Sequence, residues 1–322
     1  MSAHAPYGEG SVVAFCGGIG GAKLALGLSH VVPPDRLSVV VNTGDDFRHF
    51  GLHVSPDVDT VLYTLSGRAN PETGWGRAGE SWRFMQAIGE IGGETWFALG
   101  DTDLALHAVR TAKLDRGETL TAITRDAATA LGIAPAILPA TDHRLATLVE
   151  TDEGTLPFQR YFVERKCAPA VRAIHFDGAD AARPSPAVEA ALADPSLSAI
   201  VICPSNPYLS IDPILAIPGM RDLIQEASAP VVAVSPLVGG QAVKGPLAKI
   251  MGELGQPLTP ASVLDHYGPL VDVLLVDAAD AGLAGDPRMR IAQTLMTSLD
   301  DRIALARTAL RVAGEARAEG RR

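Results

Sequence analysis

The sequence predicts an α/β protein built on a doubly wound, mostly parallel sheet. Short apolar segments of strand length alternate with amphipathic segments of helix length along most of the chain, which is the pattern of repeated β-α-β units. The first unit carries a glycine-rich turn between its strand and its helix, and acidic turns follow the second strand. The 322 residues suffice for one large α/β domain or two modest ones, and we expect a single domain over residues 1–322.

The strands are expected where runs of apolar and β-branched residues end at polar or glycine-containing turns. They are Ser11–Cys16, Leu37–Asn42, Thr95–Leu99, Ala199–Cys203, Val231–Ser235 and Val271–Val276. Apolar residues spaced three and four apart predict the helices. These are Ala22–Ser29, Val58–Ser66, Ser81–Ile91, Leu104–Leu114, Thr121–Leu131, Lys244–Leu254 and Asp300–Ala313.

Residues 132–194 show a different pattern from the rest of the chain. Short alternations of polar and apolar residues at Thr147–Glu150 and Phe158–Val163 flank a turn at residues 151–154, which predicts a hairpin. The segment Asp177–Pro186 is rich in Ala, Asp and Pro and predicts a surface loop. We therefore expect residues 132–194 to form an insertion or cap on the main sheet.

The composition is that of a globular protein, with 47% hydrophobic and 20% charged residues. A formal net charge of -10 argues against nucleic acid or an anionic membrane as the main partner. The three cysteines, Cys16, Cys167 and Cys203, lack the spacing of zinc ligands and are expected to be free thiols. No apolar run reaches the length of a membrane span, so we expect a cytoplasmic protein.

The glycine-rich turn is the first candidate for a ligand site. Glycines at this place let the backbone approach a phosphate, and the helix that follows offers free N–H groups and a positive dipole. Lys23 could add a positive charge. The turn matches neither a Walker A loop, because Ala22 and Leu24 flank the lysine, nor a dinucleotide fingerprint, because Lys23 replaces its last glycine. Tight packing of strand on helix is the alternative explanation. The candidate residues are Gly17, Gly18, Gly20, Gly21 and Lys23.

Two acidic turns follow the second predicted strand. Asp45 and Asp46 come directly after it, at the edge where open α/β sheets bind ligands. Asp57 and Asp59 stand at the start of the next helix, where one of them could simply cap it. Carboxylate oxygens suit Mg²⁺, which usually keeps water and substrate phosphates as further ligands. The sequence therefore predicts carboxylates and a cation facing a phosphate cradle.

Further candidates lie on three later turns. Asp101 and Asp103 follow the predicted strand Thr95–Leu99, and His107 is expected to be a satisfied, partly buried histidine. Ser205 and Asn206 lie between two prolines and present hydrogen-bonding groups, although a plain Asx or Ser turn is the alternative. Lys244 stands at a helix start, where it opposes the helix dipole unless a phosphate is near.

Taken in order, these segments resemble the 2-phospho-L-lactate transferase (CofD) family of deazaflavin coenzyme F-420 biosynthesis. The resemblance extends from about Val12 to Thr297. It rests on residues 17–23, 42–46, 55–60, 62–64, 74–76, 96–103, 138–142, 158–159, 204–207, 210–211, 234–236 and 295–297. It implies a Rossmann-like α/β core, commonly in a homodimer.

The resemblance also implies a reaction. Family members move a phospho-acyl group from a guanosine diphosphate-linked donor to a hydroxyl of the deazaflavin precursor Fo, and GMP leaves. The acid of the donor is lactate, enolpyruvate or glycerate, and the product is F-420 lacking its glutamates or the dehydro form of it. Members often carry cationic residues near Ala98 and at Thr102, so this chain departs from the family there.

On this resemblance, Asp45 and Asp59, helped by Asp46 or Asp57, are expected to hold Mg²⁺ and act in catalysis. Substrates are expected to bind at the residues that follow: Gly17, Gly18, Gly20, Gly21, Lys23, Asp57, Ala98, Asp101, Asp103, Ser205, Asn206 and Lys244. Two other functions remain as alternatives. A nicotinamide-dependent reductase would use the same first turn but needs fewer acids, and a non-catalytic nucleotide sensor would bind nucleotide without forming a product from Fo.

Overall fold

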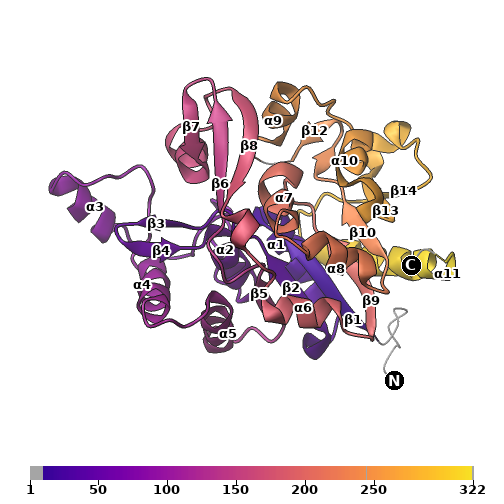
Figure 1. The fold of residues 1–322 in the computed structure, drawn as a ribbon, viewed down its shortest axis with the longest axis horizontal. Coiled ribbons are helices and arrows are strands. Elements are labelled where there is room, and N and C mark those ends of the chain that lie inside the picture. Colours follow the sequence, from indigo (N-terminus) through magenta and orange to yellow (C-terminus); the bar gives the residue numbers. More distant parts are fainter. Residues whose placement is uncertain (1–9, 244, 321–322) are drawn as a thin grey trace.

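The computed structural model describes residues 10–243 and 245–320 (Figure 1). At its centre is a seven-stranded sheet in the order β14-β13-β10-β9-β1-β2-β5, and its neighbouring strands are parallel. The strands are β1 (Ser11–Cys16), β2 (Leu37–Val41), β5 (Ala136–Pro139), β9 (Leu197–Ile202), β10 (Val231–Val234), β13 (Val273–Asp277) and β14 (Met289–Ala292). The predicted α/β class with a mostly parallel sheet is confirmed.

Helices cover both faces of this sheet because its strands are apolar on both sides. In β1, Val13 and Phe15 enter one core, whereas Val12, Ala14 and Cys16 enter the other. The second core is closed by α1 (Gly18–Ser29), α2 (Pro56–Leu65), α5 (Leu120–Ala130) and α11 (Leu299–Ala318). The first is closed by α6 (Pro186–Leu192), α7 (Asp212–Leu215), α8 (Met220–Glu226), α9 (Leu247–Glu253) and α10 (Pro260–Tyr267).

A second, antiparallel sheet lies beside the main one. It consists of β6 (Ala146–Thr151), β7 (Gly154–Pro157) and β8 (Val171–Asp177) in the order β7-β6-β8 (Figure 1). The predicted hairpin exists, but its expected second strand at Phe158–Val163 is wrong, since that segment enters a π-helical turn. Within residues 132–194, β5 is an edge strand of the main sheet and β6 to β8 lie outside it.

An arm projects from the main body at the left of Figure 1 and carries the hairpin β3 (Phe47–His49) and β4 (Leu52–Val54) with α3 (Arg83–Glu90). The helix α4 (Asp103–Leu114) packs on β4. The strand predicted at Thr95–Leu99 is wrong: these residues form a loop. Its aromatic residues pack on the β3 hairpin, with the ring centroids of Phe97 and Phe47 4.8 Å apart. The apolar run therefore reflects side-chain packing and not a strand ladder.

Short elements complete the chain. They are the hairpin β11 (Leu237–Val238) and β12 (Gln241–Ala242) and the 3₁₀ or π turns Pro34–Arg36, Arg160–Glu164, Ala179–Ala181, Pro207–Ile211, Gly268–Leu270 and Ala278–Leu283. All three cysteines are free thiols. Within residues 10–243 and 245–320, no helix is both long and apolar enough to cross a membrane.

Candidate functional site

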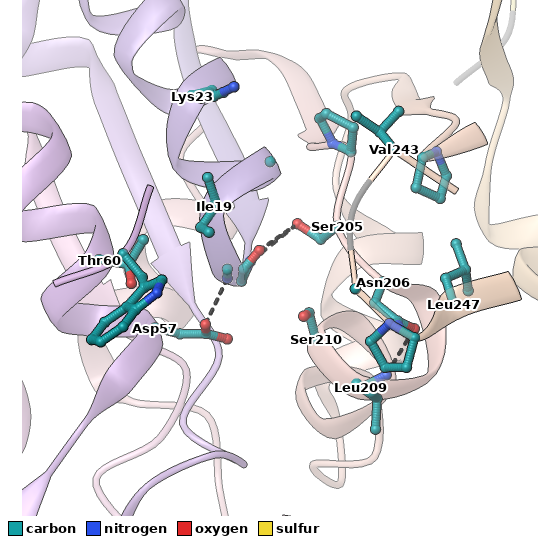
Figure 2. Close-up of a pocket in the computed structure, with 18 of the residues that line it drawn as sticks. Ile19, Lys23, Asp57, Thr60, Ser205, Asn206, Leu209, Ser210, Val243 and Leu247 are labelled. Atoms are coloured by element: carbon teal, nitrogen blue, oxygen red, sulfur yellow. Dashed lines mark hydrogen bonds between the residues drawn. The ribbon is translucent and has the colours of Figure 1, made fainter. Parts of the chain in front are cut away.

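A cavity of about 630 Å³ opens at the carboxyl ends of β1 and β9. From β1 the sheet grows in one direction through β2 and β5, and in the other direction through β9, β10, β13 and β14. The cavity therefore lies where the strand order reverses, between β1 and β9. Open α/β sheets bind ligands at this place. Figure 2 shows Asp57 and Thr60 on one side of the cavity and Ser205, Asn206 and Ser210 on the other.

The glycine turn forms one wall of the cavity through residues 17–20, whereas Gly21 does not line it. The helix α1 begins inside the turn, at Gly18, whose φ of 64° suits glycine. A side chain at Gly20 would collide with the backbone oxygen of Pro204, so close packing also requires glycine there. The first N–H groups of a helix have no partner within it, and Ile19 and Gly20 line the cavity. The turn therefore serves packing and leaves backbone donors for an anion.

The opposite wall comes from the turn after β9. The Ser205 hydroxyl accepts a hydrogen bond from Gly17 N at 3.1 Å and donates one to Gly17 O at 2.9 Å. The Asn206 side chain accepts from Tyr208 N at 3.0 Å. Both residues line the cavity, but their side chains also fix the turn, as the alternative interpretation expected.

Asp45 and Asp57 form a pair of carboxylates at the cavity, which we call the cavity pair. The side-chain N–H₂ of Asn42 donates to Asp45 Oδ1 at 3.0 Å and to Asp57 Oδ2 at 2.9 Å. Asp57 Oδ1 accepts from Gly18 N at 2.6 Å. Asn42 was not among the candidates, although it begins the acidic motif at residues 42–46 and could have been singled out there.

The cavity pair is electrostatically unfavourable in its ionised form. Burial raises the pKa of Asp45 well above its usual value, and the charge of Asp57 raises it further. Burial also raises the pKa of Asp57 to about 6, against the opposing effect of its hydrogen bonds from Asn42 and Gly18. Two buried carboxylate groups joined by one amide are a donor set that fits a hard divalent cation such as Mg²⁺.

Asp46 lies next to Asp45 in the chain but has different partners. Its Oδ2 atom lies 3.1 Å from His53 Nε2 and accepts from the Ser55 hydroxyl at 2.8 Å. Burial raises its pKa, and the contact with His53 opposes that rise. Asp46 does not line the cavity.

Asp59 lies in the first turn of α2 and forms an ion pair with Arg110 of α4. Arg110 Nη1 donates to Asp59 Oδ2 at 3.1 Å, and Nη2 donates to Asp59 Oδ1. His107 lies between Asp59 and Asp103, with Nδ1 3.6 Å from the first and Nε2 3.2 Å from the second. His107 is 1% exposed, so it lies deeper than the partly buried position that the sequence predicts.

Asp59, Asp103 and His107 lie close enough together to hold a metal ion. However, Arg110 already neutralises Asp59, and the Tyr63 hydroxyl donates to Asp103. Burial tends to raise the pKa of Asp103, but hydrogen bonding and charge at His107 outweigh it and leave the pKa lowered. We therefore interpret this group as a buried ion-pair network.

The remaining predicted residues lie at several places. Ala98 is exposed and Asp101 caps α3 by accepting from Phe84 N at 3.1 Å; neither lines the cavity. Lys23 lines it and donates to Met296 O at 3.2 Å. Lys244 lies outside the described residues.

Aromatic side chains line another part of the cavity: Trp75, Phe97, Phe158 and Phe162. The rings of Phe158 and Phe162 stack, with centroids 5.3 Å apart. These residues come from segments far apart in the sequence, so their meeting could not be inferred from spacing. The glycines that flank Trp75 were the available signal.

A helix N-terminus, a carboxylate pair and an apolar wall meet in one cavity of this α/β fold. Such a combination is typical of enzymes that act on phosphorylated ligands. The model of the family described as 2-phospho-L-lactate transferase CofD matches residues 12–311. The chain belongs to this family of transferases.

Named relatives cover nearly the whole chain. The phosphoenolpyruvate transferase of Streptomyces griseus is 42% identical, over 95% of this chain and 99% of that protein. That of Kitasatospora aureofaciens is also 42% identical, over 95% and 98%. The 2-phospho-L-lactate transferase of Methanopyrus kandleri is 39% identical, over 93% and 96%.

Solved structures share the fold. Two structures of a UPF0052-family protein from Bacillus halodurans superpose with TM-scores of 0.53 and 0.56. Each is 20% identical in sequence and covers 83% of this chain and 80% of that one. At this identity the likeness concerns the fold alone.

Proposed function

We propose that this protein transfers a phospho-acyl group from a guanosine diphosphate-linked donor to the deazaflavin Fo. Enolpyruvate is our first choice for the acid of the donor, because relatives with 42% identity are named phosphoenolpyruvate transferases. The relative named for 2-phospho-L-lactate is 39% identical, so the lactate donor is the second choice and glycerate the third. The observation that carries the proposal is the cavity pair facing the glycine turn at the reversal of strand order.

In this reaction the terminal ribityl hydroxyl of Fo attacks the β-phosphorus of the donor. The new bond joins that oxygen to phosphorus, and the bond to the bridging oxygen breaks so that GMP leaves. A carboxylate of the cavity pair accepts the hydroxyl proton. The N–H groups at the start of α1 hold the donor phosphates, and Lys23 adds positive charge.

Mg²⁺ fits the cavity pair, and when bound it would neutralise charge on the diphosphate. The resemblance assigned the ion to Asp45 and Asp59 with help from Asp46 or Asp57. The geometry favours Asp45 with Asp57, since Asp59 is neutralised by Arg110 and Asp46 does not line the cavity. The aromatic wall with Trp75 offers planar side chains on which the ring system of Fo can stack. Ser205 and Asn206 face the nucleotide or the acid.

The proposal is tested by incubating Fo and Mg²⁺ with each of the three guanylylated phospho-acids and separating the products by chromatography with mass detection. We expect product from the enolpyruvyl donor, lost on chelation of Mg²⁺. Leu305→Ala, buried in α11, is the matched control and should still form product.

No product from any donor, together with measurable nucleotide binding, would replace the transferase by the nucleotide sensor. A metal-independent change in the fluorescence of reduced nicotinamide cofactor would instead indicate the reductase. We also propose a cytoplasmic homodimer, for which light scattering after size exclusion gives the mass and fractionation of the source cells gives the compartment.

A further inference from the structure

Arg110 is a buried cation behind the cavity, on α4. Its side chain is 2% exposed, and that of its partner Asp59 is 6% exposed. The guanidinium makes two hydrogen bonds to one carboxylate, so it fixes the orientation of Asp59 as well as its distance. The mechanism proposed above assigns no role to Arg110.

The helix α2 links this ion pair to the cavity. Residues two apart on an α-helix point in directions about 200° apart. Asp57 therefore faces the glycine turn, where Oδ1 accepts from Gly18 N at 2.6 Å, while Asp59 faces α4. Any rotation or shift of the first turn of α2 moves both carboxylates together.

Arg110 also reaches the second acidic turn. Its Nη1 atom donates to His53 O at 3.4 Å, and His53 Nε2 lies 3.1 Å from Asp46 Oδ2. Asp46 directly follows Asp45 of the cavity pair in the chain. Arg110 thus contacts the neighbour of Asp57, Asp59, directly, and it reaches the neighbour of Asp45, Asp46, through His53.

We propose that Arg110 is a positioning residue that fixes the two acidic turns and so sets the place of Asp45 and Asp57. That the positions of Asp45 and Asp57 matter for group transfer rests on the function proposed above. The contact that reports it is the hydrogen bond from Gly18 N–H to Asp57 Oδ1.

The decisive measurement is the hydrogen exchange rate of the Gly18 amide in the ligand-free protein, followed by NMR. Arg110→Lys keeps the charge but loses the two-bond geometry, and Arg110→Met loses both. Because Arg110→Met strands a buried carboxylate and risks unfolding, the double variant D59L/R110M removes both charges and is expected to fold. Leu305→Ala is the control for general destabilisation.

We expect exchange of Gly18 at least tenfold faster in the double variant than in Leu305→Ala, both measured at the same interval below their melting temperatures, with Arg110→Lys between them. Equal exchange rates of Gly18 in D59L/R110M and in Leu305→Ala would overturn the positioning role and leave the ion pair a source of stability only. In steady-state kinetics of Arg110→Lys, we expect kcat to fall by a larger factor than the KM for Fo rises. If the wild-type protein forms no product, the proposed function fails, while the exchange rates still decide the role of Arg110.

Discussion

The carboxylates of the cavity pair and of the network behind it differ in their partners. Asp59 and Asp103 have cationic or polar partners in Arg110 and His107, which balance their charge. Asp45 and Asp57 share one neutral amide and repel each other. A protein maintains such an arrangement at a cost in stability, and sites of this kind are common where a ligand supplies the missing charge.

Asp57→Asn should remove a pH-dependent loss of stability from the ligand-free protein. Folding raises the pKa of Asp57. The stabilisation that its protonated carboxyl group contributes is therefore complete below the pKa of the unfolded state, about 3.9, and is lost as pH rises through about 6. Between pH 4 and pH 7 the wild-type protein should lose up to about 3 kcal/mol relative to the variant.

Denaturant titration across this pH range measures the effect, with Leu305→Ala as a control that should keep the wild-type pH dependence. The quantity compared is the change of stability with pH, because the amide that replaces the carboxylate of Asp57 would meet the amide of Asn42 and shift the absolute values. Parallel pH curves for the wild-type protein and Asp57→Asn would contradict the raised pKa.

At this scale the sequence predicted that aspartates gather near one sheet edge better than it predicted which of them lie together. The two acidic motifs placed four aspartates near one sheet edge, and two of them line the cavity. Helix geometry turns Asp59 away from Asp57, and its partner Arg110 lies 51 residues further along the chain. Pairing over that distance depends on how α4 packs on β4 and α2, which no local pattern encodes.

Among the elements, the loop of residues 67–82 bounds the cavity on the side of the arm. It carries Trp75, which lines the cavity yet is 50% exposed. Trp82, in the same loop, is 46% exposed and does not line the cavity. The two residues therefore form a matched pair for testing the proposed stacking of the Fo ring on Trp75.

Trp75→Ala should raise the KM for Fo about tenfold and change kcat little, because stacking on an aromatic side chain contributes about 1–3 kcal/mol. Trp82→Ala should leave KM within about twofold. Steady-state kinetics at varied Fo and saturating donor gives both constants. A loss confined to kcat, or equal effects of the two variants, would place the acceptor elsewhere.

The loop after β14 depends on one aspartate at the end of β13. Asp277 is buried, and its Oδ2 atom accepts from Thr294 N at 2.8 Å and from the Thr294 hydroxyl at 2.9 Å. Leu295 N donates to the same oxygen at 3.3 Å. Residues 294–297 of this loop line the cavity, so Asp277 holds part of the cavity wall in place.

Asp277→Asn should destabilise the protein at pH 7. Asp277 Oδ1 accepts from Ala279 N at 2.9 Å while Oδ2 accepts from Thr294 and Leu295, and an amide has only one acceptor oxygen to turn toward these two groups of donors. Although burial opposes it, hydrogen bonding from Ala279, Thr294 and Leu295 lowers the pKa of Asp277. Its contribution is therefore present above the unfolded pKa of about 3.9 and lost as pH falls through the folded value. In thermal melts, the difference in melting temperature between the variant and the wild-type protein should close below about pH 4. A difference that stays constant with pH would refute this account.

The whole molecule joins three parts around one cavity: the carboxyl edge of the main sheet, the loops that carry Trp75 and Phe97, and the segment at residues 158–163 that follows β7. The main sheet was predictable because its inner strands are continuous apolar runs between turns, and five of them were placed within two residues. The edge strands β5 and β14 have four residues each and were missed, since pairing with β2 and β13 defines them. Their register is a property of the assembled sheet.

Because the cavity brings the carboxylate pair and the anion-binding helix end together, a diphosphate and a divalent cation should bind cooperatively. Each ligand supplies charge that the other lacks, so GDP should tighten Mg²⁺ binding and Mg²⁺ should tighten GDP binding by the same factor, on the order of 10 to 100. Thermal stability measures the coupling, since each ligand stabilises the folded state according to its saturation. In the wild-type protein and in Leu305→Ala, the rise in melting temperature with both ligands should exceed the sum of the rises with each ligand alone. This excess should vanish in Asp57→Asn. Simply additive shifts would mean that the two ligands occupy independent sites, and the cavity pair would then have no part in holding the cation against the diphosphate.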